Sequence, residues 1–241
     1  MSALTSHDLG RRSSQTELMD TESVDIDEYR RCLQDLANVN TVTLMRRPIL
    51  RWLKRVMPRV DPGERISLID VGYGYGDVLR AIHVWSRQRD FDLDLVGLDL
   101  NPMSEPIARA ATPPNMAIDF RTGDVFTAEL GRRFDFVISS QMTHHLSDEA
   151  LVAFIRWMER TAVRGWFIGD LHRHAIPLHA FGLLARLAGW HRFVQHDGPV
   201  SIARSFRRED WQRLLAAAGQ APATVEIRWH VPFRLCVSRS R

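Results

Sequence analysis

Short apolar runs and longer amphipathic stretches alternate through the middle of the chain. The runs are typical of buried strands, and the stretches, in which apolar residues recur every three or four positions, are typical of helices. The predicted strands are 66–71, 93–99, 116–121, 134–140 and 166–170, and the predicted helices between them are 77–89, 102–110 and 148–162. Such alternation predicts an α/β fold with a mostly parallel sheet, helices on both faces, and ligands at the carboxyl ends of the strands.

The residues before the first strand have a different character. Residues 1–24 are rich in Ser, Thr, Asp and Arg, a composition that predicts a flexible tail. Apolar residues at helical spacing from Asp25 to Ala37, and again up to Met57, predict two helices. Because these helices precede the alternation, we expect residues 25–60 to form an N-terminal helical cap and residues 61–241 to form one domain.

The residues after the fifth strand predict a helical insertion and a closing hairpin. Residues 171–205 form the insertion, with an apolar helical stretch at 176–187 and a loop at 195–199. The later elements are a helix at 208–218 and two closing strands at 224–230 and 233–237. With these two strands, the expected sheet has seven strands.

The composition is that of a soluble globular protein. Hydrophobic residues make up 45% and charged residues 25% of the 241. No run approaches the roughly 20 apolar residues of a membrane span, and the polar N-terminus lacks the apolar core of a signal peptide. Cys32 and Cys236 lie far apart and form neither a disulfide framework nor a metal spacing. We therefore expect a cytoplasmic protein without a membrane span.

The charge of the chain does not predict a nucleic-acid partner. The formal net charge is only +3, and Lys54 is the only lysine, so the basic residues are almost all arginines scattered among acidic residues. No basic stripe with interleaved aromatic residues occurs. We expect no specific nucleic-acid binding and look instead for a small-molecule partner.

The stretch 66–77 has the features of a ligand-binding turn. A buried strand carries Asp70 near its end, and Gly72, Gly74 and Gly76 then alternate with other residues before a helix begins. Glycine adopts positive φ and lets backbone N–H groups approach a ligand closely, and the N-terminus of the following helix attracts negative or polar groups. A carboxylate at Asp70 would repel a pyrophosphate, but it suits a ligand with an ammonium or sulfonium group.

The Asp-x-Gly-x-Gly-x-Gly pattern of residues 70–76 resembles motif I of the class I S-adenosylmethionine (SAM)-dependent methyltransferases. The resemblance implies a Rossmann-like seven-stranded sheet, with SAM as the cofactor. Asp99 follows the second strand, where a carboxylate can accept both ribose hydroxyls of a nucleoside, NAD included. The alternative for Asp99 is a turn-capping role. Leu100 would lie against the adenine.

Two further segments resemble later motifs of the same family. In the segment 123–125 the resemblance implies that Asp124 binds the adenine amino group and that the backbone of Val125 reaches a ring nitrogen, the alternative being an ordinary loop. Residues 134–146 resemble motif IV, and Ser140 at the strand end is predicted to contact the cofactor. The segment lacks the Asn/Asp-Pro-Pro sequence typical of enzymes that methylate amino groups of DNA bases.

His144 and His145 lie just beyond the fourth strand, where the reactive methyl group is expected. With a reference pKa near 6.5, a histidine can take the proton of a phenol or hydroxyl at neutral pH. The two are therefore candidate general bases, and the sequence does not choose between them. The alternative is that one or both cap a helix or pack beneath the cofactor.

Further candidate residues follow the fifth strand and lie in the insertion. Four polar ones are predicted to line an acceptor pocket or, alternatively, to brace it: His172, His174, His196 and Arg204. His172-x-His174 lies in a predicted turn, and neither His-Glu-x-x-His nor Cys-x-x-Cys occurs, so no metal site is expected. Apolar residues predict a hydrophobic acceptor pocket, with ordinary core or a homodimer face as alternatives: Phe181, Leu183, Leu184, Trp190 and Phe193.

Three segments resemble a bacterial subgroup of the family that looks specific for small polyketide, phenolic or quinone-type metabolites. They are Leu33–Asn40, Asp170–His174, and His196–Ser201 with Arg204. The resemblance implies that Asn40 and the flanking cap close over SAM. The commoner Gly-Cys-Gly-Thr-Gly of motif I is here Gly-Tyr-Gly-Tyr-Gly. Tyr73 and Tyr75 are therefore expected to change what projects beside the methionine part of the cofactor.

The main prediction is a SAM-dependent methyltransferase that methylates a small aromatic or polyketide-type metabolite at a hydroxyl oxygen. Carbon methylation of a quinone- or polyketide-type metabolite is the alternative within the family. An NAD-dependent oxidoreductase would share the sheet, the glycine turn and Asp99, but Asp70 and the closing strands argue against it. A SAM-binding subunit without catalysis is the remaining alternative.

Overall fold

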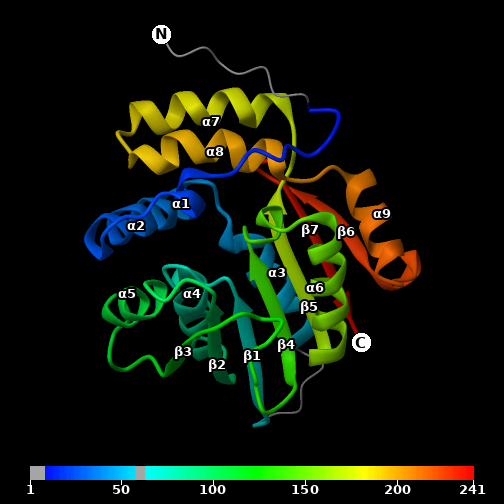
Figure 1. Cartoon of the computed structure of the whole chain (residues 1–241). Coiled ribbons are helices and arrows are strands. Elements are labelled where there is room, and N and C mark those ends of the chain that lie inside the picture. The colour runs from blue at the N-terminus through cyan, green and yellow to red at the C-terminus, as the bar shows by residue number, and fades with distance from the viewer. Residues whose placement is uncertain (1–8, 58–62) are drawn as a thin grey trace.

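Seven strands form one sheet at the centre of the molecule (Figure 1). The computed structural model describes residues 9–57 and 63–241. The strands are β1 (Arg65–Val71), β2 (Asp92–Asp99), β3 (Ile118–Thr122), β4 (Phe134–Ser140), β5 (Ala162–Leu171), β6 (Glu226–His230) and β7 (Arg234–Ser240). Their order is β3-β2-β1-β4-β5-β7-β6, with β1 to β5 parallel and β7 antiparallel to both of its neighbours. The predicted seven-stranded, mostly parallel sheet is confirmed.

Helices cover both faces of the sheet because each buries one apolar side. On one face lie α3 (Arg46–Val56), α4 (Asp77–Arg87) and α5 (Ser104–Ala110), and on the other lie α6 (Asp148–Thr161) and α9 (Arg208–Ala217). Successive residues of a strand point to opposite faces. In β1, for example, Leu68 packs in the first core and Ile69 in the second.

The position of α3 differs from the prediction. The sequence predicts one cap over residues 25–60, but α3 packs on the sheet. The ring centroid of Trp52 lies 5.4 Å from that of Phe136 and 5.5 Å from that of Phe167. Apolar periodicity predicts that a helix is buried, but it does not say against which surface. The predicted domain boundary between residues 60 and 61 lies outside the described residues.

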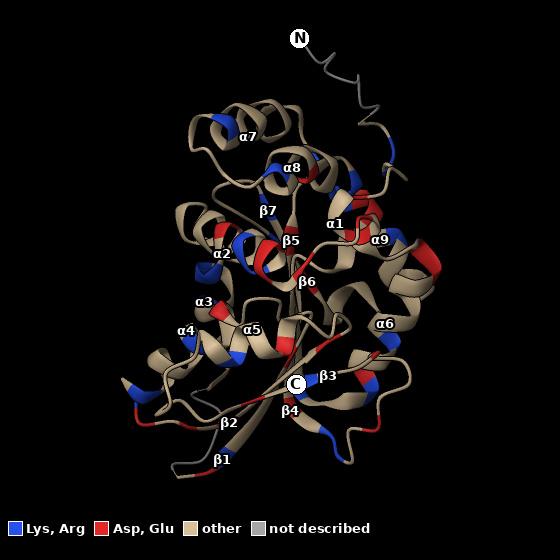
Figure 2. Ribbon diagram, turned by 60° about the vertical axis from the view of Figure 1, so that its left-hand side comes forward, with Lys and Arg blue, Asp and Glu red and all other residues tan. Residues whose placement is uncertain are grey.

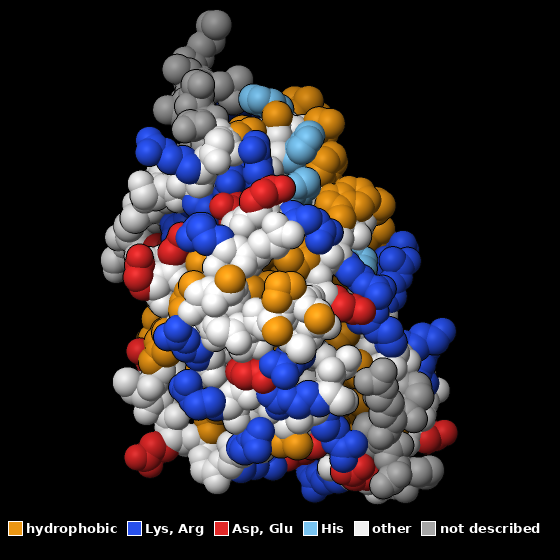
Figure 3. Space-filling model, turned by 90° about the vertical axis from the view of Figure 1, so that its right-hand side faces the viewer, with side chains coloured by type: hydrophobic (Ala, Val, Ile, Leu, Met, Phe, Trp, Pro, Cys, Tyr) orange, Lys and Arg blue, Asp and Glu red, His pale blue; other side chains and the backbone are white. Residues whose placement is uncertain are grey.

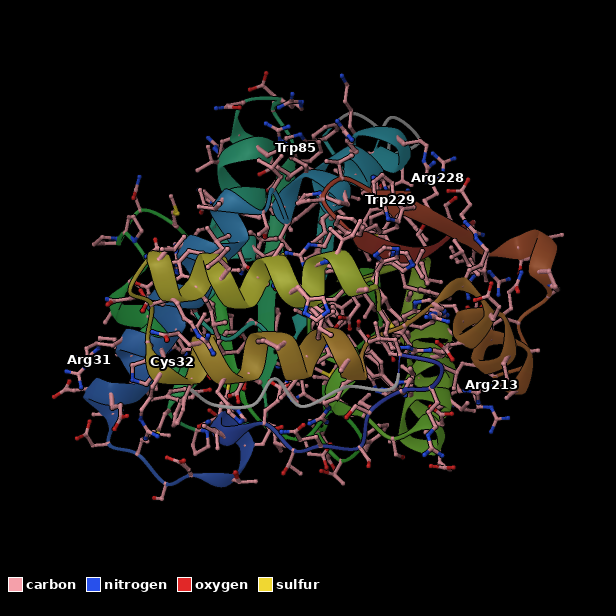
Figure 4. All side chains as sticks on the ribbon, turned by 90° about the horizontal axis from the view of Figure 1, so that it is seen from above. Arg31, Cys32, Trp85, Arg213, Arg228 and Trp229 are labelled. Atoms are coloured by element: carbon pink, nitrogen blue, oxygen red, sulfur yellow. The ribbon has the colours of Figure 1, made fainter. Side chains whose placement is uncertain are left out.

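Four helices cover the carboxyl ends of the parallel strands. They are α1 (Leu18–Thr21), α2 (Ile26–Val42), α7 (Ala175–Leu187) and α8 (Arg192–Arg204). Seen from above, α7 and α8 lie side by side across the sheet, and Cys32 of α2 lies beside α8 (Figure 4). The cap is therefore built from the N-terminal part of the chain and from the insertion after β5.

The helix α8 replaces the loop predicted at 195–199. Gly-Pro is a common turn signal, and an internal proline such as Pro199 costs about 3 kcal/mol in a helix. Phe193, Val194 and Ile202 of α8 are buried against neighbouring elements. Burial of each contributes about 1.5–3 kcal/mol, so tertiary packing outweighs the local signal.

The N-terminal segment also differs from the prediction. Residues 1–8 lie outside the described residues, but residues 9–24, predicted as part of a flexible tail, are packed onto the molecule. Arg12 donates a hydrogen bond to the Asp148 carboxylate at 2.6 Å, and Glu17 is only 3% exposed. Contacts of this kind join residues that are distant in sequence, so a local composition rich in polar residues does not reveal them.

Arginine and acidic residues are interspersed along many of the elements (Figure 2). Many form ion pairs, such as Arg132 with Asp94 at 2.6 Å and Arg239 with Glu159 at 2.7 Å. Within the described residues, no helix has the length and apolar character needed to span a bilayer.

The contact between α7 and α8 leads to a prediction for their glycines. A Cβ at Gly198 would lie 1.9 Å from the ring of Phe181, so Gly198→Ala is expected to lower the free energy of unfolding by about 1–3 kcal/mol. Thermal denaturation should show a lower Tm, by about 2–4 °C per kcal/mol. Gly182→Ala in α7 is the control, because its Cβ would lie 3.7 Å from Pro199 and alanine favours a helix. An equal fall of Tm in both variants would contradict the prediction.

Candidate functional site

The turn after β1 requires glycine for its backbone conformation. The φ angles of Gly72, Gly74 and Gly76 are +78°, +51° and +73°, a region that side-chain-bearing residues rarely adopt. A Cβ at Gly72 would also lie 2.8 Å from the side chain of Met142. The turn ends at the N-terminus of α4, so the first backbone N–H groups of that helix lack partners within it.

Asp99 lies beside this turn because β2 is the neighbour of β1. Its Oδ2 accepts a hydrogen bond from the N–H of Gly74 at 2.8 Å, and its Oδ1 accepts one from the N–H of Asn101 at 2.9 Å. Each oxygen has a second lone pair, so both can still accept ribose hydroxyls. Burial raises the pKa of Asp99. The adjacent Leu100 is 72% exposed and offers an apolar surface to a purine ring.

Asp70 is a buried carboxylate near the end of β1. It is 1% exposed, and neither oxygen has a hydrogen-bond partner among the described residues. Burial, with the nearby carboxylates of Asp77 and Asp99, raises its pKa well above the ordinary value. An unpartnered buried acid is costly, and a ligand with a positive or donor group would offset that cost. Asp70 and Asp99 together therefore fit SAM, which carries an ammonium group and two ribose hydroxyls.

A chain of hydrogen bonds joins the cap to the sheet at this edge. Gln141 donates to Asn40 Oδ1 at 2.5 Å, and Arg234 donates to Gln141 Oε1 at 3.0 Å and to Thr43 Oγ1 at 2.5 Å. Burial raises the pKa of Asp77 at the start of α4, and the nearby Asn40 side chain opposes this rise. Burial lowers the pKa of Arg234 to about 10. The predicted residue Asn40 thus lies near the start of α4. Gln141 lies in the segment that resembles motif IV but was given no role, and Arg234 lies in no recognised motif.

The remaining predicted cofactor residues follow β3 and end β4. Asp124 Oδ1 accepts the N–H of Phe126 at 2.9 Å and so braces its own turn. Val125 packs against the second core. The Oγ of Ser140 is buried and has no hydrogen-bond partner within the described residues. Ser140 therefore resembles Asp70 in presenting an unused polar atom at the carboxyl edge of the sheet.

His144 is held by Asp170, at the end of the neighbouring strand β5. The short helix η2 (Thr143–His145) follows β4 and places His144 Nδ1 2.7 Å from Asp170 Oδ1. Asp170 Oδ2 accepts hydrogen bonds from Thr143 Oγ1 at 2.5 Å and from the N–H of His144 at 3.1 Å. Burial alone would raise the pKa of Asp170, but His144 and Thr143 lower it to about 2. The free ring nitrogen of His144 is therefore Nε2.

The N-terminal segment brings two acidic residues onto the histidines. The carboxylate oxygens of Glu17 lie 3.6 Å from His144 Nε2 and 3.7 Å from His145 Nε2. Asp20 Oδ2 lies 2.9 Å from His145 Nδ1. Burial would lower the pKa of His145, but Asp20 and Glu17 raise it. Neither acidic residue could be predicted as part of the site, because α1 is a single turn without a periodic pattern.

His172 and His174 form a ring cluster with Phe233. The ring centroids of the two histidines lie 5.6 Å apart, and that of His174 lies 5.3 Å from that of Phe233. His174 Nδ1 accepts the N–H of Ile176 at 3.1 Å and caps α7. Burial, with the charge of His174, lowers the pKa of His172. In this structure His174 has the bracing role that the sequence left open.

His196 and Arg204 both lie on α8, close to the elements that surround the histidine pair. His196 Nδ1 lies 2.8 Å from Asp197 Oδ1, and the Asp197 carboxylate accepts the first two N–H groups of α1. Arg204 donates to the carbonyl oxygens of His144 at 3.1 Å and His145 at 3.0 Å. The insertion thus fixes both α1 and η2.

The two tyrosines of the glycine turn lie differently from the prediction. Tyr73 is 3% exposed, and its ring centroid lies 4.9 Å from that of Phe120 in the core. Tyr75 packs against the buried cluster of Tyr29, Leu33 and Ile107, with the guanidinium of Arg80 4.9 Å from its ring centroid. Tyr73 therefore packs into the core beneath the turn.

The apolar residues of the insertion divide between core and surface. Phe193 is buried with Cys32 of α2, whereas Leu183 and Leu187 of α7 are 62% and 78% exposed. Hydrophobic and histidine side chains gather near the top of the face shown in Figure 3, at the end of the molecule where α7 lies. Phe193 is therefore part of the core, as in the ordinary-core alternative, and Leu183 lies at the surface.

Comparison with known proteins gives the family. A family model described as "Methyltransferase domain" matches residues 42–223. No curated protein sequence matches the chain. The matched residues contain the glycine turn, Asp99 and the histidine pair.

Solved structures share the fold. Magnesium protoporphyrin IX methyltransferase (ChlM) from Synechocystis PCC 6803 with bound SAH is 16% identical, with 90% of this chain and 93% of that one covered and a TM-score of 0.57. The plantazolicin methyltransferase BpumL, in complex with a triazolic desmethylPZN analog and SAH, is 12% identical over 90% and 98%, with a TM-score of 0.64. The CurJ carbon methyltransferase is 13% identical over 90% and 61%, with a TM-score of 0.65. With the family model over most of its length, the chain belongs to the methyltransferase domain family and is a class I, SAM-dependent enzyme, as the glycine turn predicted.

Proposed function

We propose that the protein transfers the methyl group of SAM to a hydroxyl oxygen of a small hydrophobic or aromatic metabolite. The observation that carries the proposal is the His144–Asp170 pair, with its 2.7 Å contact. It follows β4 and β5 at the same edge of the sheet as Asp70 and Asp99. An oriented imidazole beside the cofactor site is what a hydroxyl acceptor needs.

In this proposal the protein positions the reactants and moves one proton. Bound SAM supplies an already activated methyl group. Asp99 and Asp70 hold its ribose and ammonium ends, so the acceptor needs only to be placed in line. Asp170 accepts the Nδ1–H of His144 and so keeps the lone pair on Nε2, which takes the hydroxyl proton. Because Glu17 lies 3.6 Å from Nε2, the acceptor reaches it only when the N-terminal segment moves aside.

Carbon methylation is the second candidate function. The CurJ carbon methyltransferase shares the fold at a TM-score of 0.65, whereas the BpumL and ChlM structures belong to enzymes with unlike acceptors. An activated carbon acceptor has less need of a general base than a hydroxyl does. The dependence of the rate on His144 therefore separates the two candidates.

A methyl-transfer assay tests the proposal. The protein is incubated with SAM and a panel of phenolic, hydroxyquinone and polyketide-type acceptors, and the methylated product is identified by mass and NMR spectroscopy. His144→Ala is expected to lower kcat by about 10²–10⁴-fold, with binding of S-adenosylhomocysteine changed less than threefold. His83→Ala on α4, a histidine outside the site, is the matched control and should keep the wild-type rate.

Two outcomes would overturn the assignment. An oxygen-methylated product formed at the wild-type rate by His144→Ala would remove the base role from this histidine. A carbon-methylated product would replace the proposed reaction by the second candidate.

A further inference from the structure

Three side chains of the kind that bind metal ions meet beneath the N-terminal segment. The ligand atoms of Glu17, His144 and His145 all lie within 4.8 Å of one another. Each histidine directs its Nε2 at a different oxygen of Glu17, at 3.6 Å and 3.7 Å. The two imidazole rings lie side by side, with centroids 4.5 Å apart. Two imidazoles and one carboxylate thus converge on one point.

Both imidazoles are oriented as they are in metal sites. The Nδ1 of His144 lies 2.7 Å from Asp170, and the Nδ1 of His145 lies 2.9 Å from Asp20. A second carboxylate on the far ring nitrogen fixes the tautomer and makes the near nitrogen a better ligand. In each ring the nitrogen that remains is the one that faces Glu17.

The cluster is rich in carboxylates. Glu17 is 3% exposed, and its Oε1 has no hydrogen-bond partner among the described residues. Asp20 and Asp170 add two more carboxylates. Arg204 donates to backbone carbonyls of η2 and lies 3.7 Å from Asp20, and Arg234 interacts with the charge of Asp170. Arg12 also approaches, but it is paired with Asp148.

We infer that Glu17, His144 and His145 bind a divalent transition-metal ion of the zinc class. Two histidines and one glutamate form a known three-ligand zinc set, which leaves a fourth position open. Ligand bonds of about 2.0–2.2 Å in a tetrahedral site place neighbouring ligand atoms roughly 3.3 Å apart. The observed 3.6 Å and 3.7 Å involve different oxygens of Glu17, and the three ligand atoms lie within 4.8 Å of one another, so metal binding requires them to move closer by up to about 1.5 Å. The sequence predicts no metal, because Glu17 is remote from the histidines in the chain.

The site would join two parts of the chain that are distant in sequence. Glu17 precedes α1 in the N-terminal segment, and the histidines belong to η2. A bound ion therefore fastens residues 9–24 over η2. It also uses the Nε2 of His144 to which the proposed function gives the acceptor proton, so the zinc-bound form is expected to be the closed and slower form. The site itself does not rest on the proposed function, because its test measures metal binding.

Calorimetric titration with ZnCl2 tests the inference. The full-length protein, without a histidine tag, is treated with EDTA, dialysed, and titrated. We expect one zinc per chain, and visible absorption of tetrahedral Co²⁺ when CoCl2 replaces zinc. Glu17→Gln and His145→Ala are each expected to weaken binding at least tenfold. The double variant His172→Ala/His174→Ala removes another neighbouring histidine pair and should bind zinc as the wild type does.

The outcomes separate this site from a fortuitous cluster. Absence of saturable zinc binding, or binding that Glu17→Gln leaves unchanged, would overturn the inference. Loss of binding in the His172→Ala/His174→Ala protein instead would place the ion elsewhere. Thermal melting of the metal-free variants shows whether each is folded, and Glu17→Gln preserves the size of the side chain. Trypsin cleavage within residues 9–24 should slow when zinc is added to the wild type and remain unchanged in Glu17→Gln.

Discussion

Asp99→Ala is expected to weaken the binding of S-adenosylhomocysteine by at least a hundredfold. In the proposed complex the carboxylate accepts two ribose hydroxyls, and a hydrogen bond to a charged group contributes about 1.5–3 kcal/mol. Loss of both corresponds to about 3–6 kcal/mol, a factor of at least ~10² in affinity. The variant also removes the acceptor of the Gly74 N–H, so the glycine turn loses a support.

Isothermal titration calorimetry measures this effect directly. Asp94→Ala is the matched control, because Asp94 lies on the same strand but pairs with Arg132 at the surface. It should bind S-adenosylhomocysteine with wild-type affinity. Binding by Asp99→Ala within fivefold of wild type would show that Asp99 does not hold the ribose. Asp99→Asn, which keeps the shape but not the charge, should fall between the two.

Asp170→Ala is expected to lower the free energy of unfolding by about 3–5 kcal/mol. The fully buried carboxylate accepts hydrogen bonds from Thr143, His144 and the N–H of Leu171. Its charge also interacts with the buried guanidinium of Arg234. Removing one member of a buried pair leaves an uncompensated charge and unsatisfied donors, which costs about this much.

Urea denaturation of wild type and variant gives the change in unfolding free energy. Asp119→Ala is the control, since this carboxylate is 45% exposed and pairs with Arg121 at the surface. Such a surface pair is worth about 1 kcal/mol or less. A change below about 1 kcal/mol for Asp170→Ala as well would mean that the buried network contributes no more than a surface ion pair does.

The sheet and the carboxylates beside the glycine turn could be predicted from local patterns. The strand at 134–140 has the predicted bounds, and β1 begins only one residue before its prediction. A glycine turn and a carboxylate at a strand end can each be recognised from a few consecutive residues. Because parallel strands all end at one edge, Asp70 and Asp99 had to meet once their strands were recognised.

The cap could not be predicted in the same way. Local sequence patterns predicted a loop at 195–199 and a flexible tail at residues 1–24, and they assigned the helix α3 to the cap. In each case the burial of side chains against distant elements decided the outcome. The sequence of a short apolar or polar segment does not specify the surface on which the segment packs.

By itself, the sequence determined the seven-stranded fold, the glycine turn, the carboxylates near the ends of β1 and β2, and the histidine pair after β4. All of these follow from periodicity, glycine conformation and strand ends, which are local properties. Only the tertiary structure decided what orients the histidines. Asp170 comes from the neighbouring strand and Glu17 from the folded N-terminal segment. Their approach depends on packing between residues far apart in the chain, and no local pattern encodes it.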